Sequence, residues 1–244
     1  MKNVQFLSNS AQIDKITKGL SLTKSLFVSS LLIGEEHTGK KTFIQTLFPN
    51  SIYVDANQEQ ELITALETNN ELIIYNFEKV KNIETLNFEN KRIIAIANTI
   101  KERAKCSQVF AFIYEMPKLE EREDLSTLIL HFQKKIQKEL ILDFEISLDL
   151  KKLDFTQNIK SLKASIYKQL LLRTLTKKDI QELLYDYLFR ELEGNNAYRE
   201  HLSLYEEPLI QAGLNKYKSQ LKLAGVLGLN RNTLRKKIQE YDIH

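Results

Sequence analysis

The 244-residue chain has few of the residues that break helices or cross-link a chain: three prolines, seven glycines and one cysteine. Because Cys106 is alone, a disulfide within the chain and a cysteine-based metal cluster are both excluded. The four histidines show no ligand spacing, so we predict no metal site. Sparse glycine and proline favour long helices joined by few turns.

Long apolar runs are also missing. No run approaches the length of a membrane span, and residues 1–20 lack the apolar core of a secretory signal. We therefore expect a cytoplasmic protein with no membrane association. The net charge is only +3 and the isoelectric point is near 8.7, so any nucleic-acid binding must come from charge that is placed locally.

Short β-rich runs alternate with helical patterns in the first part of the chain. The strand-like runs span residues 26–33, 51–54, 71–77, 92–97 and 109–114. This alternation predicts an α/β domain with a parallel sheet covered by helices. After about Leu125 the apolar spacing becomes helical, over residues 125–140, 159–172 and 178–192. The sequence Gly194-Asn195-Asn196 then predicts a linker.

Three more helices are predicted beyond this linker, over residues 197–215, 219–227 and 231–241. Ser219 is a plausible N-cap, and Gly228 stands where the chain must turn sharply before Asn230 caps the last helix. On that helix the apolar residues fall at i, i+4 and i+7, so they share one buried face: Leu234, Ile238 and Tyr241.

The opposite face of the last helix carries side chains that can hydrogen-bond base edges, with cations on its flanks. We predict a DNA-binding set made of Asn230, Arg231, Asn232, Thr233, Arg235, Lys236, Lys237 and Gln239. A lone basic amphipathic helix is usually only a solvated surface. Here the turn glycine, the small Ala224, the cap and the paired helix occur together, which favours a helix-turn-helix.

The segment LGLNRNTLRKKIQEYDI (227–243) resembles the C-terminal module of the Fis family, which enhancer-binding activators of the sigma-54 class share. The resemblance implies a homodimer formed by the long helices that precede the reading unit. The candidate helix here lies around 198–217, with an apolar stripe of Leu202, Leu209, Ile210 and Leu214. One departure is Leu223, where the family usually has alanine.

Near the start of the chain, GEEHTGK (34–40) follows a β-rich run and precedes a helical one, which is the context of a phosphate-binding loop. The candidate nucleotide-binding residues are Gly34, Glu35, His37, Thr38, Gly39, Lys40, Lys41 and Thr42. Lys41 stands where most such loops carry the Ser or Thr that binds Mg²⁺, and Thr42 comes one residue late. A glycine-containing turn without a ligand is an equal alternative on this motif alone.

Four further blocks resemble the AAA+ central domain of NtrC-like sigma-54 activators, in the same order and at similar spacing: FLSNSAQI (6–13), RIIAIAN (92–98), MPKLEEREDLSTLILHF (116–132) and FTQNIKSL (155–162). Asn98 falls at the polar position of the sensor-one strand, and Lys160 at the place of the sensor-two arginine. The resemblance implies an AAA+-like α/β domain over residues 1–140, a helical lid-like subdomain over 141–193 and a Fis-type helix-turn-helix over 197–244.

The sequence departs from this family at the residues and loops with which the family hydrolyses ATP and engages the sigma factor. Tyr75 and Asn76 replace the Asp-Glu pair that holds Mg²⁺ and activates water, and Glu78 lies beyond the strand end. The loop that engages the sigma factor is absent, and only Arg103 remains near the shortened arginine-finger segment. We therefore predict a degenerate AAA+ domain, with no catalytic residue and no ATPase activity, although ATP or ADP could still bind.

The predicted function is a sequence-specific DNA-binding transcriptional regulator that does not use ATP hydrolysis or sigma-54 contact. Its expected partners are double-stranded DNA, a second copy of the chain or a higher oligomer, and an RNA polymerase or regulatory protein. Two alternatives are an ATP-dependent AAA+ activator or remodeller, and an architectural DNA-binding protein like Fis. A more remote alternative is an adaptor whose helix-turn-helix binds protein.

Overall fold

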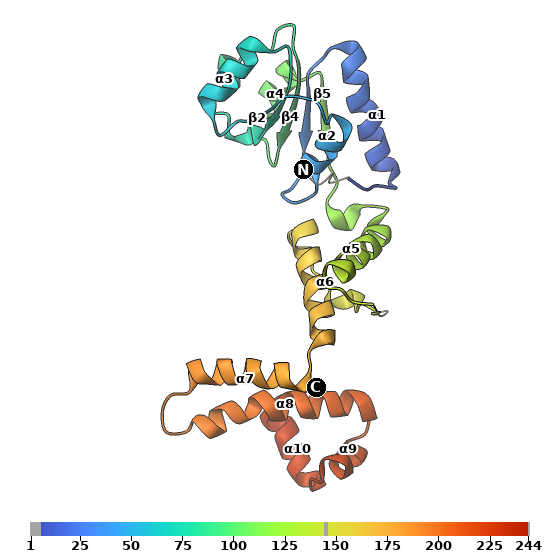
Figure 1. The fold of residues 1–244 in the computed structure, drawn as a ribbon, viewed down its shortest axis with the longest axis vertical. Coiled ribbons are helices and arrows are strands. Elements are labelled where there is room, and N and C mark those ends of the chain that lie inside the picture. The colour runs from blue at the N-terminus through green and yellow to red at the C-terminus, as the bar shows by residue number, and fades with distance from the viewer. Residues whose placement is uncertain (1–5, 144–145, 244) are drawn as a thin grey trace. The chain divides into compact units, whose positions relative to one another are not determined.

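The computed structural model describes residues 6–143 and 146–243, and in this part of the chain five parallel strands form one sheet in the order β2-β3-β4-β1-β5 (Figure 1). The strands are β1 (Ser30–Ile33), β2 (Tyr53–Asp55), β3 (Glu71–Tyr75), β4 (Arg92–Ala97) and β5 (Phe112–Glu115). Each lies within or overlaps a predicted run, which confirms the α/β class. The first strand begins later than predicted, because a helix continues to Leu26 and ends at Phe27 in a left-handed conformation, with φ of 51°.

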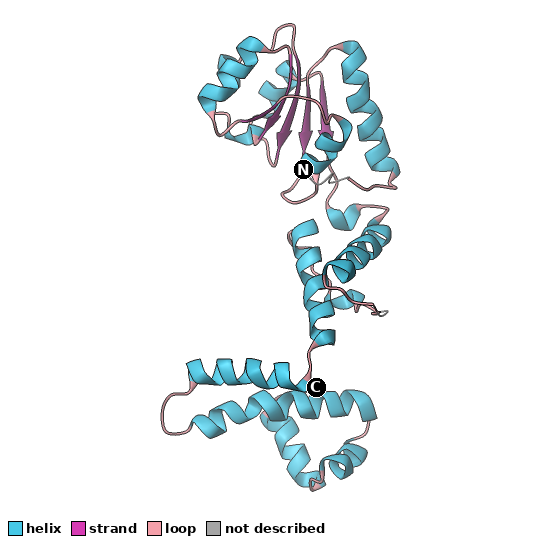
Figure 2. Cartoon of the chain, in the orientation of Figure 1, coloured by secondary structure: helices cyan, strands magenta, loops and turns pink. Residues whose placement is uncertain are grey.

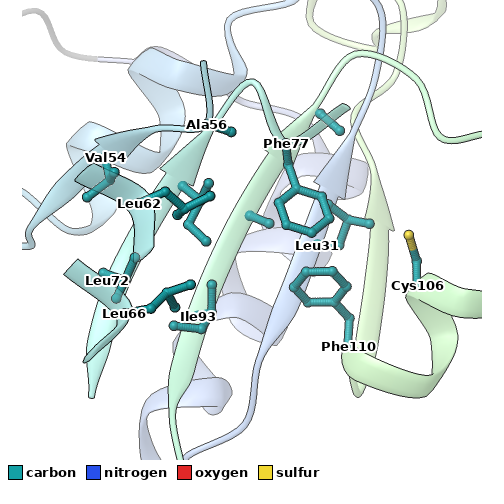
Figure 3. Packing of buried hydrophobic residues seen from close by; sticks show 13 residues of the cluster. Leu31, Val54, Ala56, Leu62, Leu66, Leu72, Phe77, Ile93, Cys106 and Phe110 are labelled. Atoms are coloured by element: carbon teal, nitrogen blue, oxygen red, sulfur yellow. The ribbon is translucent and has the colours of Figure 1, made fainter. Parts of the chain in front are cut away.

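Helices cover both faces of the sheet (Figure 2). Alternate side chains of a strand point to opposite faces, so Leu31 and Leu32 of β1 belong to two different apolar clusters. Leu31 packs in the cluster that includes residues of α3 (Glu59–Thr68) and of α4 (Arg103–Val109), whose C-cap residue is Phe110 (Figure 3). Leu32 packs in the cluster that includes residues of α1 (Ala11–Leu26) and α2 (Lys40–Leu47). The sheet is therefore buried between two helical layers.

A helical subdomain follows the sheet and has its own apolar core. It contains α5 (Leu125–Glu139) and α6 (Ile159–Thr174), whose inner faces bury Leu128, Ile136, Leu162, Ile166 and Leu170. Short 3₁₀ turns occur at η1 (Phe77–Lys79), η2 (Ile83–Thr85), η3 (Leu119–Glu121) and η4 (Leu150–Lys152).

The remaining helices form a second compact unit, which begins at Leu175. They are α7 (Lys177–Glu191), α8 (Ala197–Tyr217), α9 (Gln220–Leu227) and α10 (Arg231–Glu240), and they match the predicted helices. The unit boundary differs from the prediction, which placed α7 with the lid-like subdomain. A Thr176–Asp179 capping box starts α7 as a new helix, and Gly194 lies in the short loop that joins α7 to α8. None of the described helices is long and apolar enough to cross a membrane.

Candidate nucleic-acid interface and phosphate-loop cavity

The last two helices form a helix-turn-helix whose local features follow from the sequence. The Ser219 side chain accepts a hydrogen bond from the Lys222 backbone N–H and caps α9. Gly228 ends α9 in the left-handed region, with φ of 65°, a conformation that favours glycine. Asn230 then accepts from the Asn232 N–H at 2.9 Å and caps α10. These predicted caps and this predicted turn are all confirmed.

One face of α10 is buried and the other is free. Leu234 is fully buried, and Ile238 and Tyr241 pack beside it in the core of this unit, as predicted. Seven of the eight predicted DNA-binding residues are exposed: Asn230, Arg231, Asn232, Thr233, Arg235, Lys236 and Gln239. The helix therefore presents guanidinium, ammonium and amide groups to solvent, which suits base edges and phosphates in a major groove.

The eighth residue, Lys237, is held within the protein. Its Nζ lies 2.5 Å from Oε2 of Glu206 on α8, and the side chains of this pair are only 23% and 19% exposed. The hydroxyl of Tyr241 donates to the same carboxylate oxygen at 2.5 Å. Lys237 was predicted as a phosphate contact, but in this structure it attaches α10 to α8. No local sequence signal points to this pair, because Glu206 lies 31 residues earlier.

These bonds change the acidity of both partners. Hydrogen bonds from Lys237 and Tyr241 hold the pKa of Glu206 below its usual range, so the carboxylate stays ionised at neutral pH. The bond to Glu206 raises the pKa of Tyr241 to about 12, so the phenol remains a donor.

The bulky Leu223 is accommodated by a glycine on the neighbouring helix. A Cβ added to Gly213 of α8 would lie 2.3 Å from Cδ1 of Leu223. Both residues are buried in the helix-turn-helix core. The larger side chain at position 223 therefore fits because position 213 is a glycine and has no side chain.

A second candidate site lies where the loop Gly34–Gly39 joins β1 to α2. Lys40 is only 5% exposed, and its Nζ donates to the backbone oxygens of Gly34 and Glu35, both at 2.6 Å. It also donates to Oδ1 of Asn98 at 3.1 Å. Burial lowers the pKa of Lys40 to about 8, against the opposing effect of Glu78 and other carboxylates.

Five of the predicted nucleotide-binding residues line a cavity of about 590 Å³: His37, Gly39, Lys40, Lys41 and Thr42. The other three shape the loop. Gly34 and Glu35 accept from Lys40, and buried Thr38 donates its hydroxyl to the Glu35 carbonyl at 3.0 Å. Gly39 has φ of 95°, and a Cβ there would lie 2.9 Å from the ring of Phe6.

The ends of β3 and β4 bring polar and aromatic groups to this cavity. Tyr75 is 7% exposed, and burial raises the pKa of its hydroxyl, which therefore stays protonated. Asn76 donates to both carboxylate oxygens of Asp55, at 2.9 and 3.0 Å. Glu78, which the sequence places beyond the end of the strand, lines the cavity and accepts from the N–H and side-chain amide of Asn98, both at 3.1 Å.

The helical subdomain is hydrogen-bonded to the same loop. The Asn158 side chain donates to Oε2 of Glu35 at 3.2 Å and to the carbonyl oxygen of Glu36 at 3.0 Å. The backbone N–H of Ile159 donates to the carbonyl of His37 at 3.1 Å. Lys160, predicted at the place of the sensor-two arginine, lines the cavity as well. The start of α6 is thus hydrogen-bonded to the phosphate loop.

Comparison with known proteins assigns the helix-turn-helix unit. The family described as bacterial regulatory protein, Fis family, matches residues 202–241. A Fis-like DNA-binding protein of Pseudomonas aeruginosa is 38% identical over 71 residues, which are 28% of this chain and 67% of that protein. The chain belongs to the Fis family of bacterial regulatory proteins. The DNA-binding transcriptional regulator NtrC of Azospirillum brasilense is 43% identical over 68 residues, or 26% of this chain and 14% of NtrC.

The comparison extends beyond the Fis-type unit in structure. The crystal structure of NtrX from Brucella abortus in complex with ATP aligns with a TM-score of 0.51 and 14% identity, over 98% of this chain and 70% of that chain. This likeness concerns the fold. It agrees with a parallel α/β domain followed by helices, and the family match at residues 202–241 assigns the C-terminal Fis-type helix-turn-helix.

The Fis-type unit also exposes large apolar side chains on the two helices that precede its helix-turn-helix. Those on α7 include Ile180, Leu183, Tyr185 and Phe189, and those on α8 include Tyr198, Leu204, Tyr205 and Leu209. The predicted stripe on α8 is therefore split, since Ile210 is buried in the unit's own core while Leu209 is exposed. A group of exposed large apolar side chains on two helices is a candidate association site.

Proposed function

We propose that this Fis-family protein is a sequence-specific transcriptional regulator that reads double-stranded DNA through α10 and does not hydrolyse ATP. The observation that carries the proposal is the two-sided character of α10. Leu234 is fully buried, whereas Asn232, Arg235 and Lys236 are exposed together on the far side. Arginine and asparagine make bidentate bonds to guanine and adenine edges, and such contacts distinguish one base pair from another.

The apolar faces of α7 and α8 support binding as a dimer. A second copy that covers these faces would bury Phe189, Tyr185 and Leu204, which are 75%, 65% and 40% exposed in the single chain. A two-fold dimer would present two α10 helices to half-sites about one helical turn, or roughly 34 Å, apart. The expected operator is therefore a palindrome with that spacing.

The residues at the end of β3 favour a regulator that does not hydrolyse ATP. Hydrolysis needs a carboxylate that holds Mg²⁺ at the end of β3, and this strand ends in Tyr75 followed by Asn76. One observation favours the alternative of an active ATPase. Glu78 lies in the cavity, bonded to Asn98, where a carboxylate could activate water.

Footprinting of genomic fragments tests the DNA-binding part of the proposal. We expect the wild-type chain to protect discrete sites and the Arg235→Ala/Lys236→Ala variant to lose them. Lys24→Ala, which removes an exposed lysine from α1, serves as the matched control and should leave the sites protected. Uniform coating of all fragments by the wild type would support the architectural alternative and contradict a sequence-specific regulator.

Phosphate release from ATP in the presence of Mg²⁺ tests the part that concerns hydrolysis. We expect no turnover above that of the Lys40→Ala variant. Turnover that both Lys40→Ala and Glu78→Gln abolish would establish the ATPase alternative, with Glu78 as the base. Because DNA protection is measured separately, the two parts of the proposal can fail independently.

A further inference from the structure

The cavity beside the phosphate loop has the size and lining of a small-molecule site. Its volume of about 590 Å³ lies within the range of roughly 300–1,000 Å³ that is usual for ligand pockets. One part of its wall is apolar and includes Phe6, Leu128, Phe132 and Ile159. Such a wall can receive a flat heterocyclic base.

The rest of the wall is strongly cationic. The lining residues include five lysines and one arginine against one carboxylate, that of Glu78. The cations are Lys40, Lys41, Arg122, Lys135, Lys160 and Lys163. Arg122 is only 3% exposed, and its Nε and Nη2 donate to the carboxylate of Asp124 at 2.9 and 2.8 Å, whereas its Nη1 has no hydrogen-bond partner among the described residues. A buried guanidinium donor without a partner at a cavity wall favours an anionic ligand.

The group that this fold family would place beside the phosphates, a Mg²⁺ ion, does not fit these residues. Mg²⁺ needs hard oxygen ligands, usually carboxylates. The residues at the end of β3 are Tyr75, whose phenol is protonated, and Asn76, whose amide is bonded to Asp55. The carboxylate that lines the cavity, that of Glu78, already accepts two hydrogen bonds from one asparagine, one at each of its oxygens. Asp55 also accepts from the backbone N–H and the side chain of Asn57, at 2.9 and 2.8 Å.

A side-chain cation lies over the last residue of β3. Lys41 is the second residue of α2, and its Nζ lies 4.2 Å from the centre of the Tyr75 ring, a cation–π contact. Its charge also acts on the carboxylate of Asp55. A metal ion at this point would be repelled by the ammonium group, whereas a phosphate would be attracted by it.

From this geometry we infer that the cavity binds a nucleoside di- or triphosphate without a divalent cation, and that the Lys41 ammonium takes the place of the metal. The loop N–H groups and the start of α2 receive the phosphates, Lys41 neutralises part of their charge, and Nη1 of Arg122 supplies one further donor. The apolar wall around Phe6 and Phe132 receives the base. Lys40 exchanges its bonds to the Gly34 and Glu35 carbonyls for bonds to phosphate. This inference deepens the proposed function, because it names the ligand of a domain proposed not to hydrolyse ATP.

Titration of the full chain with ATP and ADP, once in EDTA and once in excess Mg²⁺, tests the inference. We expect binding in EDTA that Mg²⁺ leaves unchanged or weakens. We expect Lys41→Ala to weaken ATP binding in EDTA by about tenfold or more, the effect of losing a charge-assisted bond, and Lys41→Arg to retain binding. Lys24→Ala is the control and should match the wild type.

A designed variant sharpens the test. Lys41→Ser combined with Tyr75→Asp supplies the hydroxyl and carboxylate that Mg²⁺ prefers, so this variant should bind ATP only when Mg²⁺ is present. Inorganic triphosphate should bind the wild type about tenfold more weakly than ATP, because it leaves the apolar wall uncovered. Thermal melting of each variant confirms that it is folded.

Three results would overturn the inference. They are no binding of ATP or ADP to the folded wild-type chain in EDTA, binding that requires Mg²⁺, and equal affinity for ATP and inorganic triphosphate. DNA protection by the same preparations is measured without nucleotide. A failure of nucleotide binding can therefore be distinguished from a failure of the DNA-binding proposal.

Discussion

The two units of this chain differ in the polar groups that they place at their candidate sites. In the helix-turn-helix unit the caps, the turn glycine and the exposed face of α10 are all present. In the α/β domain the phosphate loop is present, but β3 ends in Tyr75 and a lysine lies over that ring. Tyr75 is itself part of the buried cluster on one face of the sheet, so the last residue of β3 contributes to packing as well as to the lining of the cavity.

The largest expected effect concerns the exposed face of α10, which we propose contacts DNA bases. Arg235→Ala should weaken binding to a protected site by about 10- to 100-fold, since a bidentate base contact contributes about 1–3 kcal/mol. Binding to random DNA should change much less. Fluorescence anisotropy with both DNAs measures the two affinities. Equal losses on both DNAs would mean that Arg235 contacts phosphate rather than a base.

The next effect concerns the packing of that unit. Gly213→Ala should lower the free energy of unfolding by about 1–3 kcal/mol, because the new methyl group overlaps Leu223. The double variant Gly213→Ala/Leu223→Ala should lose less than the sum of the two single losses, because the new methyl group fills part of the space that Leu223 leaves. Denaturant unfolding of each variant measures it.

Gly225 of α9 is the matched control, since a Cβ there meets nothing within 4 Å. Gly225→Ala should stabilise α9 by up to about 1 kcal/mol through helix propensity. A Gly213→Ala variant as stable as Gly225→Ala would contradict the packing described between α8 and α9.

The contact between Gly213 and Leu223 also illustrates what the sequence could and could not predict. Strands, helices, caps and the buried face of α10 follow from local periodicity and from Ser219, Gly228 and Asn230, and the structure confirms them. The fit of Leu223 against Gly213 depends on how two helices cross, which no local pattern reports. The pairing of Lys237 with Glu206 was missed for the same reason.

The candidate site in the α/β domain shows a similar division. The loop and its lysine were predictable from spacing, whereas the bonds of Glu78 to Asn98 join the ends of two strands that pair only in the folded sheet. Glu78 follows the end of β3 in the sequence, and no local pattern predicts the short 3₁₀ turn that places its side chain in the cavity.

A smaller effect is expected from the pH dependence of the phosphate loop. Lys40 has a pKa of about 8 in this structure, lowered by burial and partly restored by Glu78, Glu36 and Glu35. A bound anion favours the protonated form, so nucleotide affinity should be full below pH 8 and fall by about tenfold between pH 7 and pH 9. Calorimetric titration with ATP in EDTA measures the change. Lys40→Arg, which stays protonated, should show a flat profile, and a flat wild-type profile would contradict a role for Lys40 in binding.

The smallest effect concerns the attachment of α10 to α8. Glu206→Gln should lower the free energy of unfolding by about 1 kcal/mol at pH 7, because a charged bond to Lys237 becomes a neutral one. The pKa of Glu206 is lower in the folded than in the unfolded chain, so its stabilisation is present above the unfolded pKa and is lost as pH falls through the folded value. The difference between wild type and variant should shrink towards pH 3. A difference that persists at low pH would assign the effect to packing.

The most direct test of the central claim follows both units in one solution. A labelled fragment carrying a protected site is titrated with the wild-type chain in ATP and Mg²⁺, while DNA occupancy is read by anisotropy and released phosphate by absorbance. We expect the wild-type chain to occupy the DNA site completely, with no phosphate release above that of the Lys40→Ala variant. Phosphate release that depends on Lys40, or a site that remains empty, would contradict this expectation.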